Sequence, residues 1–134
     1  MTRVLADAVD AAAAVARGSP DARAALERFD RDLAPRQLGV PVRQLDFLAA
    51  ELWDEVGDHP RALAAIRRRN VHYADGSGEA DCLREEGRLA ALTWDRDGAI
   101  AAYRRYLALR SDPEPSVRPE VERVRRALAA LVSD

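Results

Sequence analysis

The chain has 134 residues, a length that is typical of a single domain and sufficient for a hydrophobic core. Its 21 basic and 23 acidic side chains are mixed along the sequence and leave a formal net charge of −2, which argues against a nucleic-acid-binding or membrane-surface protein. The basic residues other than two histidines are all arginine, and this excludes lysine chemistry such as a Schiff base or a P-loop.

The sequence also favours a cytoplasmic location. No apolar run reaches the length of a membrane span, and the charged opening MTRVLADAVD does not have the pattern of a signal peptide. The single cysteine, Cys82, cannot form an internal disulfide, which agrees with a reducing compartment.

Helical periodicity runs through the whole chain. Alanine is abundant, no alternating apolar and polar run occurs, and Gly and Pro fall between segments of helical period. We therefore expect an all-α protein of about seven helices in a single domain over residues 1–134. The expected helix pairs cover residues 2–34, 42–73 and 80–110, and a final amphipathic helix over 117–132 caps the stack.

The apolar stripes of these segments predict which residues face the core. In the first helix the stripe is Leu5, Ala8, Val9, Ala12 and Val15 or Ala16. In the second helix it is Ala22, Ala25, Leu26, Phe29 and Leu33, and in the third it is Leu45, Leu48, Ala49, Leu52 and Val56. The fifth helix is expected to turn Leu83, Gly87, Ala90 and Trp94 inward, and the last helix Val117, Val121, Val124, Leu128 and Leu131.

One helical pattern occurs three times. Ala25, Ala62 and Ala99 are spaced 37 residues apart. A branched aliphatic residue follows each alanine, and a large apolar residue follows three positions later: Leu26, Leu63 and Ile100, then Phe29, Ile66 and Tyr103. Such a repeat indicates stacked helical hairpins, because a single hairpin cannot bury its apolar face alone.

These residues make the chain resemble the tetratricopeptide-repeat (TPR) family. The best match runs from Leu83 to Pro113, with Gly87 at the small packing position, Ala99 at the start of the second helix and Tyr103 at the aromatic position. The chain departs from the family at Glu86 and Tyr106, and its period is longer. The resemblance implies a TPR-like α–α superhelix whose first helices line a concave groove that holds a peptide or a partner helix.

Transferring the groove positions of the family gives a candidate binding site. The fifth helix contributes Asp81, Arg84 and Arg88, and the third helix contributes Arg43, Asp46 and Trp53 if its apolar stripe sets the register. A register one residue different, counted back from Ala62, would place Gln44, Phe47 and Glu51 there instead. In the preferred register Trp53 is either a partly exposed interface anchor or a packing residue against the first or fourth helix.

The sequence contains few side chains that could bind a metal or take part in catalysis. His72, Asp75, Asp81 and Cys82 lie around one connection but lack the spacing of a metal site, and no metal or other cofactor is expected. His59 lies in a helix-start turn, and Cys82 reads as a small packing residue. The basic run Arg67–Asn70 ends a helix, where the helix dipole favours arginine without any nucleic acid.

The sequence therefore predicts a non-catalytic protein-interaction module or adaptor. Arginines of the fifth helix would pair with acidic groups of a peptide while an aromatic side chain fills an apolar pocket. The alternatives are an accessory or regulatory subunit of an enzyme or transcriptional regulator, and a small-molecule-binding helical protein. An array this short is also compatible with a homodimer formed through its end helices.

Overall fold

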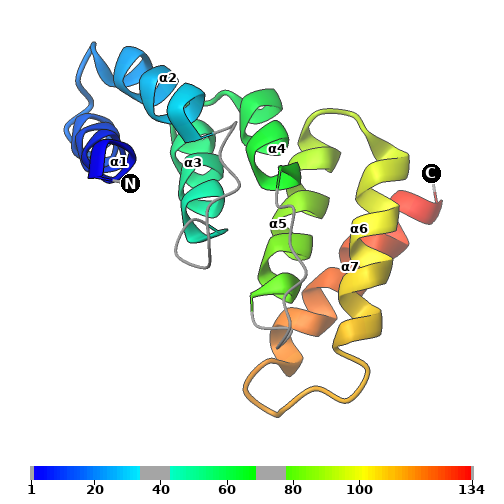
Figure 1. Cartoon of the computed structure of the whole chain (residues 1–134). Coiled ribbons are helices and arrows are strands. Elements are labelled where there is room, and N and C mark those ends of the chain that lie inside the picture. Colours follow the sequence, from blue (N-terminus) through cyan, green and yellow to red (C-terminus); the bar gives the residue numbers. More distant parts are fainter. Residues whose placement is uncertain (1, 34–42, 69–77, 134) are drawn as a thin grey trace. The chain divides into compact units, whose positions relative to one another are not determined.

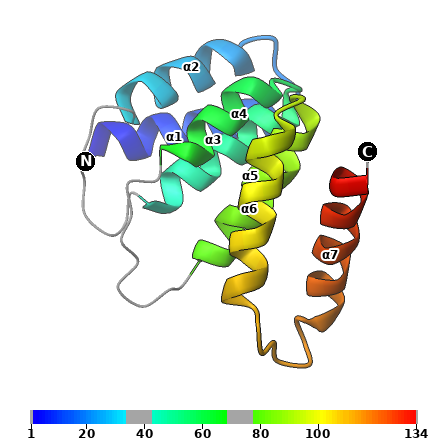
Figure 2. The same ribbon diagram turned by 90° about the vertical axis from the view of Figure 1, so that its right-hand side faces the viewer.

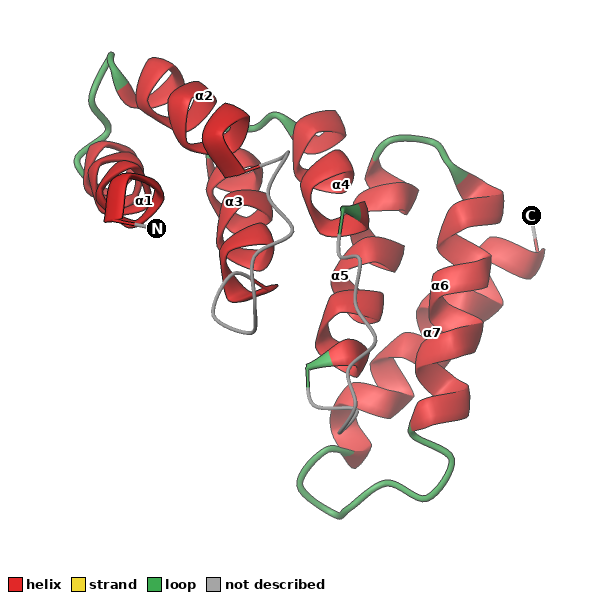
Figure 3. Cartoon of the chain, viewed as in Figure 1, coloured by secondary structure: helices red, strands yellow, loops and turns green. Residues whose placement is uncertain are grey.

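The fold is known from a computed structural model that describes residues 2–33, 43–68 and 78–133, without the side chains of residues 2, 43 and 44. Within these ranges the chain forms seven α-helices and no strand (Figure 3), which confirms the all-α prediction. The contacts divide the chain into an N-terminal unit, Met1–Val71, and a C-terminal unit, His72–Asp134. One continuous stack over residues 1–134 stays a prediction.

The N-terminal unit contains two helical hairpins. The first comprises α1 (Thr2–Ala16) and α2 (Ala22–Leu33), and the second comprises α3 (Arg43–Glu55) and α4 (His59–Arg67) (Figure 1). Helix α3 also packs against both helices of the first hairpin, so the two pairs share a core. The buried face of α2 is Ala22, Ala25, Leu26, Phe29 and Leu33, as predicted.

The stripe predicted for α1 is wrong by about one residue. The buried residues of α1 are Val4, Ala8, Ala11 and Ala14. Leu5 is 45% exposed and Val9 is 67% exposed, although both were expected in the core. Helix α1 is rich in alanine, and small side chains allow the closest approach of an adjacent helix. The face that carries the alanines is therefore buried, and the larger residues beside it are exposed.

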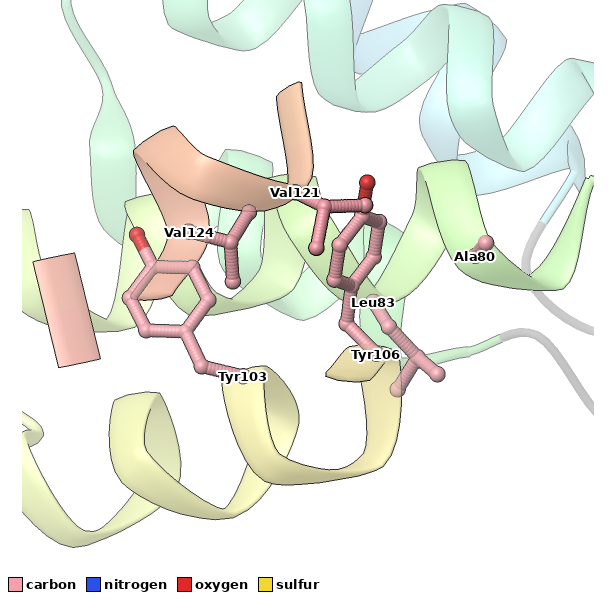
Figure 4. Close-up of a cluster of buried hydrophobic side chains, with 6 residues drawn as sticks. All are labelled: Ala80, Leu83, Tyr103, Tyr106, Val121 and Val124. Atoms are coloured by element: carbon pink, nitrogen blue, oxygen red, sulfur yellow. The ribbon is translucent and has the colours of Figure 1, made fainter. Parts of the chain in front are cut away.

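The C-terminal unit is a hairpin of α5 (Glu79–Leu92) and α6 (Arg96–Leu109), against which α7 (Arg118–Ser133) packs (Figure 2). The Tyr103 and Tyr106 rings extend from α6 toward Val124 and Val121 of α7, with Leu83 beside Tyr106 (Figure 4). Ala80 completes this cluster, and Leu128 and Leu131 lie partly buried against it. Four residues of the predicted α7 stripe thus face the core.

The three hairpin turns have the same backbone geometry. Each places one residue at positive φ: Gly18 at 61°, Gly57 at 83° and Trp94 at 64°. The next backbone N–H closes the first helix, from Ser19 to Ala14 at 3.0 Å, Asp58 to Trp53 at 2.9 Å and Asp95 to Ala90 at 2.9 Å. In the second and third turns the side chain of that same residue then caps the second helix by accepting a backbone N–H bond, from Arg61 at 3.1 Å and from Gly98 at 3.0 Å. In the first turn the Ser19 hydroxyl instead accepts from the Asp21 N–H at 3.2 Å, one residue before α2 begins. The repeat is therefore present in turn geometry as well as in sequence.

The repeated residues lie in the core. Ala25, Ala62 and Ala99 are all buried, and so are Phe29, Ile66 and Tyr103 at the large apolar position. Gly87 lies opposite Tyr103, which is the close approach expected of the small packing position.

Trp94 corrects the prediction for the end of α5. It was expected on the inward stripe, but α5 ends at Leu92 and Trp94 occupies the left-handed turn with its side chain 93% exposed. The helix ends early because the Thr93 hydroxyl and the turn N–H groups satisfy the last carbonyls, including Thr93 Oγ1 to Leu89 O at 2.9 Å.

Candidate functional site

A cleft of about 320 Å³ lies between α5, α6 and α7 in the C-terminal unit. Its walls are charged and its floor is apolar. The lining residues are Arg84, Glu85, Arg88, Tyr103, Glu120, Arg123, Val124 and Ala127. The volume is at the lower end of the range for ligand pockets and is sufficient for one aromatic or acidic side chain of a partner.

A hydrogen-bonded triad fixes one wall of the cleft. Glu120 of α7 accepts from the Arg84 guanidinium through Oε1 and from the Tyr106 hydroxyl through Oε2. Burial alone would raise the pKa of Glu120, but the Tyr106 hydroxyl and Arg84 outweigh it and hold the pKa below its usual value. Burial and the bond to Glu120 raise the pKa of Tyr106 to about 12. The carboxylate is therefore ionised at neutral pH and keeps the Arg84 guanidinium in one orientation.

A second arginine is held in the same way. Arg88 donates to Glu85 Oε2 from both Nε and Nη2, at 3.1 and 2.8 Å. Burial raises the pKa of the adjoining Tyr103 hydroxyl, and the positive charge of Arg88 offsets part of that rise. Two carboxylate-anchored guanidinium groups therefore border the cleft before any ligand arrives.

Arg123 supplies a third, more exposed guanidinium from α7. Among the residues that the structure describes it has no hydrogen-bond or ion-pair partner. It lies one residue before the buried Val124, at the boundary between solvent and the apolar floor. This arginine can turn toward an acidic group of a ligand without breaking an internal pair.

The structure brings together two of the residues predicted for the binding groove. Arg84 and Arg88 both line the cleft. Asp81 is about half exposed, lies 3.4 Å from Arg84 Nη1 and does not line the cleft. Six lining residues were not predicted as site residues: Glu85, Tyr103, Glu120, Arg123, Val124 and Ala127. The last four belong to α7, to which the sequence pattern assigned only a capping role.

The residues predicted on the third helix lie in the N-terminal unit. Arg43 begins α3, but its side chain lies outside the described part of the structure. Asp46 is a packing residue: Arg68 Nε lies 3.3 Å from its Oδ1 and also pairs with Asp30 of α2. Burial raises the pKa of Asp46 more than Arg68 lowers it. The Asp46 carboxylate thus pairs with an arginine of its own unit. Among the residues that the alternative register would place in the groove, Phe47 is half-buried and Glu51 is exposed. The side chain of Gln44 lies outside the described part of the structure.

Trp53 is not a partly exposed anchor. Its exposed fraction is 0%, so the packing interpretation is the correct one. The guanidinium carbons of Arg23 from α2 and Arg61 from α4 lie 5.5 and 4.7 Å from its ring centroid. These arginines are held by carboxylates in turn: Arg23 Nη2 is 2.7 Å from Asp58 Oδ2, and Arg61 Nη1 is 3.0 Å from Glu27 Oε1. The ring is thereby enclosed by anchored cations.

Of the other candidate residues of the sequence analysis, those that the structure describes have structural roles. His59 Nδ1 lies 2.9 Å from Asp54 Oδ1 beside the α3–α4 turn. Cys82 is buried. His72 and Asp75 lie outside the described residues. Within residues 2–33, 43–68 and 78–133, no group of three or more His, Cys, Asp and Glu is arranged to hold a metal ion.

Comparison with family models, with curated proteins and with solved structures found no match to this chain. Among the helices described here, none is long and apolar enough to cross a membrane.

Proposed function

We propose that the chain is a TPR-like, non-catalytic protein-interaction module that binds a partner segment in the cleft of its C-terminal unit. The observation that supports this proposal best is the cleft itself, which has a volume of about 320 Å³ and in which Arg84, Arg88 and Arg123 surround an apolar floor. The cytoplasmic location and the adaptor role belong to the same proposal.

The arrangement of the cleft selects the chemistry of its ligand. Arg84 and Arg88 are oriented by Glu120 and Glu85, so little side-chain entropy remains to be lost on binding. A guanidinium plane already paired at its edge still offers its face to an aromatic ring. Arg123 can pair with a carboxylate. The preferred ligand is therefore a peptide or helix that presents an aromatic residue next to an acidic one.

Selection from a random peptide display library tests this proposal. Peptides recovered on the wild-type chain should carry an aromatic residue within two or three positions of Asp or Glu. Arg123→Glu should abolish that enrichment, because it places a carboxylate at the mouth of the cleft. Arg104→Glu is the matched control, since Arg104 is an exposed helical arginine that does not line the cleft.

Two outcomes would contradict the proposal. One is recovery of no motif above an unrelated helical protein. The other is a motif that persists unchanged in Arg123→Glu while far-UV circular dichroism shows both variants to be as helical as the wild type.

A further inference from the structure

Trp94 occupies a position that ordinarily requires glycine. The two other hairpin turns have Gly18 and Gly57 at their left-handed residue, whereas the third has Trp94 at φ 64°. A side chain with a Cβ is strained in this conformation, and 93% of this one is exposed. Neither packing nor turn geometry explains an indole here, so the exposed ring itself invites a functional explanation.

The same chain shows how it accommodates an indole elsewhere. Trp53 is enclosed by Arg23 and Arg61, and each of these arginines is paired with a carboxylate. The cleft of the C-terminal unit contains the same chemistry without the indole: Arg84 is paired with Glu120, and Arg88 with Glu85. Its apolar floor, formed by Val124 and Ala127, would contact the ring.

We propose that Trp94 of one copy of this chain inserts into the cleft of a second copy. This inference rests on the proposed function of the cleft and names its ligand. Trp94 does not line its own cleft, so the contact joins two molecules.

The charges beside Trp94 suit the same contact. Asp97 follows three residues later and is exposed, so the indole is accompanied by a carboxylate. The cleft carries three arginines against two glutamates, and Arg123 is positioned to meet an incoming Asp97. Leu92, which is half exposed, extends the apolar surface around the indole. The segment Leu92–Asp97 thus has the aromatic and acidic character that the cleft selects.

The inserting residue and the receiving cleft are different surfaces of one unit. Such a contact either reciprocates in a closed dimer or continues from molecule to molecule. In both cases each copy contributes one Trp94 and one cleft, and this allows the two halves of the contact to be inactivated separately.

A mixing experiment on the full chain tests the proposal. The variants are Trp94→Gly, which removes the ring and suits the left-handed turn, and Arg123→Glu, which reverses a charge in the cleft. Light scattering after size exclusion, over a dilution series, should show the wild type above monomer mass at high concentration and each variant about 30-fold or more weaker in self-association. A mixture of the two variants should regain a complex, because one supplies the cleft and the other supplies Trp94.

Arg104→Glu serves as the control and should associate like the wild type. A wild type that stays monomeric up to about millimolar concentration would overturn the inference, since that corresponds to a free energy weaker than about −4 kcal/mol. Self-association of Trp94→Gly equal to that of the wild type, or a mixture that stays monomeric, would overturn it too. None of these three results would affect peptide selection by the cleft, so failure of the proposed function is recognised separately.

Discussion

Gly87→Ala should destabilise the C-terminal unit, although alanine is the better helix former. A Cβ at position 87 would lie 2.4, 2.5 and 2.9 Å from Cε1, Cδ1 and Cζ of Tyr103. Carbon atoms normally approach to about 3.5 Å, so the ring would have to retreat by about 1 Å. Tyr103 is buried in the cluster that contains Val124 and Leu83, and it cannot move that far without disturbing them.

The size of the effect follows from two opposing contributions. Replacing glycine within a helix gains about 1 kcal/mol of helix propensity. Forcing a methyl group into a packed core costs about 1–3 kcal/mol, and an overlap with three ring atoms belongs at the upper end of that range. The expected net loss is about 1–2 kcal/mol in the free energy of unfolding.

Urea unfolding followed by far-UV circular dichroism would measure this loss, and hydrogen exchange of α5 and α6 would assign it to the C-terminal unit. Exchange in α3 and α4 serves as the internal reference. The same glycine change in a Tyr103→Leu background should cost less or become stabilising, because the ring that it strikes is gone. A Gly87→Ala variant that is more stable than wild type with Tyr103 in place would refute the packing argument.

Four further changes test the remaining structure. Trp94→Gly should stabilise the C-terminal unit by about 0.5–1 kcal/mol in urea unfolding, because relief of left-handed strain exceeds the flexibility of glycine; destabilisation would contradict this. The pKa of Tyr106 is raised from 10.0 to about 12. The Tyr106 hydroxyl therefore makes its full contribution to the stability of the folded chain below pH 10, and this contribution is lost as the pH rises toward 12. Tyr106→Phe should therefore remove that alkaline loss in a pH series of thermal melts, whereas an unchanged slope would refute it. The pKa of Glu120 is lowered, so its stabilisation is lost as the pH falls below 4.5, and Glu120→Gln should flatten that acid limb. Arg68→Ala should lower the free energy of unfolding of the N-terminal unit by about 1–2 kcal/mol, because it leaves carboxylates unpaired. The loss should be smaller when Asp46→Asn is added, since that change removes one of the unpaired carboxylates. Equal losses in the single and double variants would refute the pairing.

The hairpins could be predicted because each has a local signal. Periodicity gives the helices, and Gly57, Asp58 and Pro60 mark one turn unambiguously. The inward face of α2 was confirmed residue by residue because large and small apolar residues alternate with charges there. The face of α1 was not, because a helix with many alanines has no stripe that clearly outweighs its neighbours.

The site was harder to predict because it depends on contacts between helices. Arg84 and Arg88 could be found from the family resemblance, but Glu120 and Arg123 belong to a helix that no single repeat contains. The environment of Trp53 stayed open between an interface and the core, since aromatic residues suit both equally well. A comparison of the three turns would have identified Trp94, since the two other turns place glycine at the same point.

Site-specific photocrosslinking in the host cell tests the central claim most directly. A benzophenone amino acid at position 123 should give a discrete crosslinked species, and mass spectrometry should locate the attached peptide in a segment with adjacent aromatic and acidic residues. The same amino acid at position 104 should give none. Equal crosslinking from both positions, or no adduct from position 123, would contradict binding in the cleft.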